Sequence, residues 1–172
     1  GRPLTAALVD APTPAQRYLD GVRAILDQVR AAGAEIEAGR QLPESVVELL
    51  RGGGVFNVAV PRSWGGPECD LPTLARGIEL IASADASAGW CAMIGSDTGF
   101  VSAFLDDAVG RALFTDLSQA SVFVLNPGGA AKPVEGGYAV SGRWPFASGC
   151  THAKVYALGC LMYHMLVGRV PF

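Results

Sequence analysis

The sequence predicts an α+β fold in which an all-helical N-terminal domain is followed by strands of an antiparallel β-domain. Apolar residues recur at helical spacing between residues 14 and 117, and the period changes to two between residues 119 and 160. A block of helices followed by a block of strands is typical of α+β proteins rather than of alternating βαβ units. The chain has 172 residues, half of them hydrophobic, which suffices for one domain and part of a second.

The first helices are predicted from their starting prolines and their apolar stripes. Residues 1–13 carry two prolines and little periodicity, so we expect a flexible arm. Pro14 suits the first turn of a helix, and the apolar pattern that follows continues to about residue 36 and breaks near Gly39. Pro43 opens a second helix, which we expect to end at the glycine run of residues 52–54.

The rest of the helical domain alternates loops and helices. Residues 55–61 are expected to be extended, and residues 61–67 to form a rigid loop around Trp64. Residues 71–82 read as a helix, and Asp85 is placed to cap the next one by accepting hydrogen bonds from free backbone N–H groups. That helix is expected to run to about residue 105 and, being apolar nearly all round, to be buried. Asp106 caps a last short helix through residue 114.

The β-domain is predicted over residues 118–160. Residues 121–125 are β-branched and aromatic, as in strands. Gly136 and Gly137 form a turn, after which Tyr138, Val140 and Trp144 alternate with small or polar residues. Residues 161–172 do not continue this pattern and are treated as an atypical tail.

Composition argues against several kinds of partner. The net charge is −3 with only two lysines, so no basic surface for nucleic acid is expected. The four cysteines form no C-x-x-C pair; we expect no metal site, and reduced thiols in a cytoplasmic protein. We expect neither a signal peptide nor a membrane-spanning helix, because no basic segment precedes an apolar run and no apolar stretch reaches about 20 residues.

Few residues have the pattern of a chemical site. There is no glycine-rich phosphate loop, and a lone histidine such as His152 or His164 is more often structural than catalytic. Residues 142–153 stand out because a strand ends in an aromatic, a small and a hydroxyl residue followed by glycine. An isoalloxazine ring requires an apolar wall and a few hydrogen-bond donors. The residues alone leave two interpretations: a flavin contact, or Phe146 in the core and Ser148 capping a turn.

Four motifs then occur in the order of one known family. They are LPESVVELLRGGGVF at 42–56, VPRSWGG at 60–66, ELIASADASAGW at 79–90 and GYAVSGRW at 137–144. Together they resemble the N-terminal portion of the acyl-CoA dehydrogenase superfamily. The resemblance implies that the antiparallel β-domain is incomplete here, because in the family it continues and is followed by a C-terminal four-helix bundle. We therefore expect a fragment that retains flavin weakly or not at all.

Two segments bear on which branch of this superfamily the chain resembles more. The dehydrogenases usually carry T-E-x-x-x-G-S-D where this chain has LNPGG at 125–129. The segment WPFASGCTHA at 144–153 is more similar to the branch that hydroxylates aromatic substrates with dioxygen and reduced flavin from a separate reductase. That branch often has a histidine in the helix after Trp90, where this chain has Ser96 and Asp97. An acyl-CoA dehydrogenase acting on an acyl thioester, or a non-catalytic remnant, stays open as an alternative.

The resemblance also implies a site. The cofactor would be FAD or FMN, with the Ser148 hydroxyl donating to flavin N5 or O4 as the catalytic contact. The residues that would contact the flavin are Leu125, Asn126, Phe146, Ala147 and Ser148, and those on the substrate side are Trp90 and Ser96. Full-length relatives would be homo-tetramers that act on a small molecule and are supplied by a flavin reductase.

The last 19 residues, 154–172, resemble a helix of Ser/Thr protein kinases. None of the other kinase motifs is present, so kinase activity is not expected. We interpret the tail as a junction near residues 155–161 and expect poor order beyond residue 161.

Overall fold

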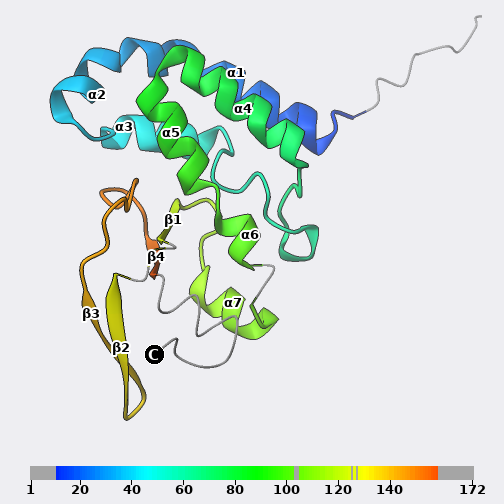
Figure 1. The fold of residues 1–172 in the computed structure, drawn as a ribbon. Coiled ribbons are helices and arrows are strands. Elements are labelled where there is room, and N and C mark those ends of the chain that lie inside the picture. Colours follow the sequence, from blue (N-terminus) through cyan, green and yellow to red (C-terminus); the bar gives the residue numbers. More distant parts are fainter. Residues whose placement is uncertain (1–10, 103–104, 125, 127, 159–172) are drawn as a thin grey trace, which may run out of the picture.

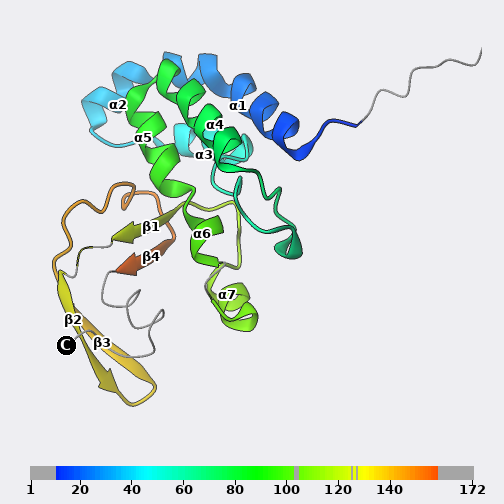
Figure 2. The same ribbon diagram turned by 45° about the vertical axis from the view of Figure 1, so that its right-hand side comes forward.

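The computed structural model describes residues 11–102, 105–124, 126 and 128–158, and the side chains of these residues except 156–158. A layer of five helices lies above two short helices and two separate two-stranded sheets (Figures 1 and 2). The upper helices are α1 (Pro14–Ala31), α2 (Gly33–Gly39), α3 (Glu44–Gly52), α4 (Leu71–Ala84) and α5 (Ala86–Gly95). The lower ones are α6 (Thr98–Ser102) and α7 (Asp107–Leu113). The kinase-like tail beyond residue 158 and most of the N-terminal arm lie outside the described residues.

Helix α1 begins as its sequence predicts, but it ends early. Thr13 and Gln16 form a reciprocal capping box, with Gln16 N donating to Thr13 Oγ1 at 3.1 Å and Thr13 N donating to Gln16 Oε1 at 2.7 Å. The single helix expected over residues 14–36 is divided at Ala32 into α1 and α2. Gly33 directly after the break favours it, because glycine loses the most backbone freedom in a helix.

The core lies between α1, α3, α4 and the chain that follows α3. Gly77 of α4 lies directly against Tyr18 of α1, where an added Cβ would be 2.0 Å from the phenol oxygen. Burial, followed by the nearby Cys69, raises the pKa of Tyr18 to about 12. The expected extended piece at residues 55–61 is wrong: the chain forms successive turns there. Its apolar residues are buried in the core rather than alternating across a strand; they are Val55, Phe56, Val58 and Val60.

The long helix expected from Asp85 to about residue 105 is also wrong. Asp85 does cap α5, accepting from Ala88 N at 2.8 Å, but the helix breaks at Ser96 and Asp97. Beyond the break, Gly99 lies so close to residue 59 that an added Cβ would be 2.3 Å from that backbone. This close packing of Gly99 against residue 59 accounts for the break. The helix is not buried all round, since Trp90 is 54% exposed.

The strands form two separate pairs, one antiparallel and one parallel. In the hairpin, β2 (Gly129–Val134) runs antiparallel to β3 (Gly137–Gly142), with Gly129 opposite Gly142. Strand β1 (Ser121–Val124) instead pairs in parallel with β4 (Val155–Leu158), with Ser121 opposite Val155. The α+β class and the antiparallel hairpin are confirmed. The parallel pair was not anticipated, and β3 ends at Gly142, so Trp144 lies beyond the strand.

Two further findings concern the described residues. No helix in the described ranges is long and apolar enough to cross a membrane. Cys69 and Cys91 are not joined in a disulfide, and burial raises the pKa of each of these two thiols. Cys160 lies outside the described part of the chain.

Candidate functional site

The turn that follows β3 presents an aromatic ring and a hydroxyl next to each other. Phe146 adopts a left-handed φ of 61° and is 92% exposed, while Ala147 and Ser148 are half-buried. The interpretation that placed Phe146 in the core is therefore wrong. Pro145 restricts the backbone before the turn, and Gly149 allows a φ of 84° after it. The Ser148 hydroxyl has no hydrogen-bond partner among the described residues and is free to donate.

The loop between β1 and β2 lies beside this turn. Asn126 is exposed, and its carbonyl accepts a hydrogen bond from Gly128 N at 2.8 Å. Arg143 N in turn donates to the Gly128 carbonyl at 3.1 Å, which joins the loop to the start of the turn. The structure thus brings Asn126 and Phe146 onto neighbouring segments. Leu125 lies outside the described residues.

Trp90 lies in the middle of α5 and Ser96 directly follows its last residue, and the two differ in accessibility. Trp90 lines a groove of about 500 Å³ between α2 and α5, together with Leu42 and Cys91. Ser96 is buried, and its hydroxyl donates to the Met93 carbonyl at 2.9 Å. The structure does not bring the two together, and of the two only Trp90 offers an open surface.

Asp97 is a candidate that sequence reasoning missed. It lies half-buried at the break between α5 and α6, and burial raises its pKa to about 6. Its carboxyl has no hydrogen bond or ion pair with any described residue. A signal was present, because Asp97 is the only charged residue between Asp85 and Asp106. Carboxyl groups of raised pKa can exchange protons near neutral pH, which makes such residues candidates for acid–base roles.

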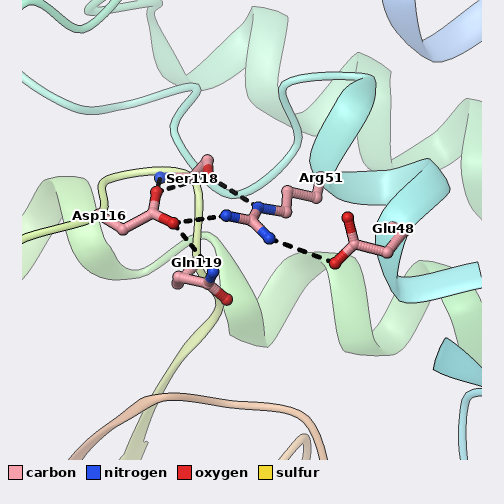
Figure 3. Close-up of polar contacts among 5 residues, drawn as sticks. All are labelled: Glu48, Arg51, Asp116, Ser118 and Gln119. Atoms are coloured by element: carbon pink, nitrogen blue, oxygen red, sulfur yellow. Dashed lines mark hydrogen bonds and ion pairs between the residues drawn. The ribbon is translucent and has the colours of Figure 1, made fainter.

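A polar cluster ties the helical layer to the strand beneath it (Figure 3). Arg51, in the last turn of α3, donates through Nε to Ser118 Oγ at 2.8 Å and through Nη2 to Asp116 Oδ2 at 2.5 Å. Glu48 accepts from the same guanidinium at 3.2 Å. Hydrogen bonds from Ser118 and then Gln119 hold the pKa of Asp116 at about 2. The cluster fixes the segment that leads into β1 and the Asn126 loop.

The loop around Trp64 has a structural explanation. Trp64 Nε1 donates to Asp107 Oδ1 at 2.6 Å, and the Arg111 guanidinium lies 5.3 Å from the centre of the indole ring. Arg111 also donates to the Ser63 carbonyl at 2.9 Å. Trp64 therefore attaches the loop to α7, which leaves the turn at Phe146 as the better candidate for binding a ligand.

The residues at this turn fit an isoalloxazine ring. Phe146 offers a flat apolar face, and Ser148 supplies a hydroxyl without a partner in the described part of the chain. Asn126, exposed on the neighbouring loop, adds an amide. An apolar wall with a few polar groups at its edge is the composition that such sites require.

The order of the elements defines the class of protein: an all-helical domain is followed by a β-domain. The family described as "Acyl-CoA dehydrogenase, N-terminal domain" matches residues 14–110, which is more than half of the chain. The chain therefore belongs to the acyl-CoA dehydrogenase family through its N-terminal domain.

Curated relatives of similar sequence are oxygenases. The chain is 33% identical to the oxygenase component of the FADH(2)-dependent resorcinol hydroxylase of Rhizobium sp. (strain MTP-10005), over 92% of this chain and 40% of that protein. It is 30% identical to the indole-3-acetate monooxygenase of Pseudomonas putida, over 90% of this chain and 38% of that protein. The chain thus spans about two fifths of the length of these relatives.

Solved structures agree with the family assignment. The crystal structure of the HsaA monooxygenase from M. tuberculosis superposes with a TM-score of 0.74 at 30% identity, covering 84% of this chain and 42% of that one. XiaF from Streptomyces sp., in complex with FADH2 and glycerol, superposes with a TM-score of 0.77 over 84% of this chain and 37% of that one. At 21% identity, XiaF supports the fold alone.

Proposed function

We propose that this chain provides the N-terminal part of a flavin-dependent monooxygenase, the oxygenase component of a two-component system that hydroxylates a small aromatic molecule. The observation that carries the proposal is the similarity, at 30% identity or more, to oxygenases of this family. The exposed Phe146 supports it from the structure, as does the Ser148 hydroxyl, which no described residue engages in a hydrogen bond. The acyl-CoA dehydrogenase alternative has less support, because the Thr-Glu of that branch is replaced by Leu125 and Asn126.

In this proposal the chain's own residues bind and orient a reduced FAD or FMN. The flavin, when bound, supplies two electrons to dioxygen, so that one oxygen atom enters the substrate and the other leaves as water. Phe146 and Ala147 would cover one face of the ring, and the Ser148 hydroxyl would donate to N5 or O4. Asn126 and the neighbouring backbone, with Leu125, would meet the polar edge. A donor that is fixed where charge develops can change the rate strongly.

The remaining parts of the proposal concern substrate and partners. Trp90 is the better placed of the two proposed substrate residues, because its ring is open to the groove between α2 and α5 whereas Ser96 is buried. Reduced flavin would come from a separate reductase, and the full-length oxygenase would be a homo-tetramer. A cytoplasmic location, inferred from the expected reduced thiols, stays a prediction.

The test compares the wild-type chain with Ser148→Ala. Oxygen-free titration with reduced FMN and reduced FAD measures affinity. Because a pocket shared between domains loses contacts when one domain is absent, we expect the isolated chain to bind flavin weakly and to retain none on purification.

For turnover, the chain is then joined to the C-terminal remainder of the resorcinol hydroxylase, and phenols are screened for a product heavier by one oxygen atom. Unchanged affinity and unchanged turnover in Ser148→Ala would remove Ser148 from the site, and a bright yellow, fully loaded chain would contradict the expected weak binding.

A further inference from the structure

His152 is a buried polar side chain that the proposed flavin contacts leave without a role. It is 8% exposed, and its Nε2 has no hydrogen-bond partner in the described part of the chain. Its Nδ1 lies 3.4 Å from Thr151 Oγ1, which is a long and weak contact. An unpaired buried nitrogen is unfavourable, and an apolar side chain would occupy the same space without that penalty. The imidazole therefore lacks a polar partner among the residues that the structure describes.

The backbone places this imidazole against the Ser148–Gly149 turn. The Gly149 carbonyl accepts hydrogen bonds from His152 N at 3.1 Å and from Ala153 N at 3.0 Å, which folds the chain back beneath the turn. A Cβ added to Gly149 would lie 3.4 Å from His152 Nε2 and 3.4 Å from Val122 Cγ2. The ring thus fills the space between the turn and β1, directly behind the residue that follows Ser148.

Gly149 also determines what can approach the nitrogen. Its φ of 84° favours glycine, and any larger side chain would contact Nε2 from the side of the turn. Burial lowers the pKa of His152, and Glu44 opposes this shift. The ring is neutral at neutral pH, so one nitrogen carries a proton and the other accepts, and Nε2 can take either role.

Resting on the flavin site proposed above, we propose that His152 is a further flavin-binding residue, whose Nε2 hydrogen-bonds to the polar edge of the bound ring from beneath the Ser148–Gly149 turn, directly or through one water. The apolar contacts of Phe146 and the hydroxyl of Ser148 would then be joined by a third contact from the same turn. A purely structural imidazole would fill space but would not respond to the ligand.

Nitrogen NMR of the wild-type chain tests the contact without any enzyme assay. The two imidazoles are assigned with His164→Gln, and FMN is added while its binding is followed by quenching of flavin fluorescence. We expect the His152 Nε2 resonance to move in proportion to the bound fraction while the His164 signals stay in place. Saturation with FMN and an unmoved Nε2 resonance would overturn the proposal.

Matched variants separate hydrogen bonding from packing. His152→Leu keeps an apolar side chain of related volume, and we expect it to raise the dissociation constant for FMN about tenfold, the loss of one good contact. His152→Gln keeps a polar group and should recover part of that loss. Circular dichroism checks that each variant folds; if His152→Leu does not, the glutamine variant and the wild-type spectra decide.

Ser148→Ala distinguishes failure of this inference from failure of the proposed function. If Ser148→Ala weakens FMN binding and His152→Leu does not, the flavin site stands and the role of His152 is overturned. If neither FMN nor FAD binds at millimolar concentration to the wild-type chain or to the chain joined to the C-terminal remainder of the resorcinol hydroxylase, the flavin site itself is contradicted, and the inference with it.

Discussion

The helical layer and the β2–β3 hairpin differ in where their apolar side chains lie. Leu50 on α3 and Val22 on α1 are fully buried, whereas all six residues of β3 are exposed, including Val140 and Tyr138. Strand β1 belongs with the helices, because its residues are largely buried and it contacts α5. The first region carries its own core, while the apolar side chains of the hairpin, such as Val140 at 39% exposure, are partly open to solvent. The candidate flavin turn lies where the two regions meet.

Core truncation should separate the two regions most clearly. Leu50→Ala removes a fully buried side chain and is expected to lower the free energy of unfolding by about 3 kcal/mol. Val140→Ala, on the exposed hairpin, should change it by less than about 0.5 kcal/mol. Urea unfolding followed by circular dichroism measures both. Equal losses would mean that the hairpin shares the core of the helical layer.

Asp97 lies between α5 and α6, in the helical region. Its substitution should raise the free energy of unfolding by an amount that depends on pH. Burial raises the pKa of Asp97 from its ordinary value of 3.8 to about 6, so the free energy of unfolding falls as the pH rises from about 4 to about 6. Asp97→Asn should stabilise the chain by about 1 kcal/mol above this window, a value reduced for solvent screening of a half-buried group, and should give no gain below it. Unfolding at the two pH extremes measures the difference.

The exposed Asp27 provides a control for this experiment, because Asp27→Asn changes charge without affecting a buried carboxyl. If both variants behave alike with pH, the raised pKa of Asp97 is contradicted.

The cluster around Arg51 should couple the helical layer to β1 but not to the hairpin. A double-mutant cycle with Arg51→Leu and Asp116→Asn is expected to give a coupling of about 0.5–1 kcal/mol, because Asp116 is partly exposed. Hydrogen bonds from Ser118 and Gln119, followed by the charge of Arg51, lower the pKa of Asp116 to about 2, so the stabilisation from the whole cluster is fully present above pH 3.8 and is lost as the pH falls through about 2.

Hydrogen exchange locates the coupling. In Arg51→Leu, amides of residues 121–124 should exchange faster, while those of residues 129–142 should not change. Faster exchange throughout the hairpin would show that the cluster supports both strand pairs.

The smallest effect is expected at Trp64. Trp64→Phe keeps an aromatic ring against α7 but removes the 2.6 Å hydrogen bond to Asp107, and we expect a loss of about 0.5 kcal/mol. The pKa of Asp107 is lowered first by its hydrogen bond to Arg111 and then by Trp64, so carboxyl NMR should report a rise in this pKa. An unchanged Asp107 pKa would contradict the hydrogen bond from the Trp64 indole to this carboxylate.

Sequence reasoning reached the class of fold, the caps at Asp85 and Asp106 and the hairpin turn, because each depends on neighbours along the chain. It did not reach the break at Ser96 and Asp97, since that depends on how closely Gly99 approaches residue 59. Among the candidate site residues, the sequence singled out Phe146 and Ser148 as neighbours. It left open whether Phe146 faced the core or solvent.

By itself, the sequence determined the order of helices before strands and the family to which they belong, because periodicity, capping residues and motifs are local. Only the tertiary structure decided that β1 pairs in parallel with β4, that Arg51 reaches Asp116, and that the imidazole of His152 lies beneath Gly149 with no partner for Nε2 among the described residues. Each of these contacts joins segments or atoms whose meeting depends on the path of the backbone in space. Burial and desolvation, which shift the pKa of Asp97 and of His152, arise from that path and not from the identity of neighbouring residues.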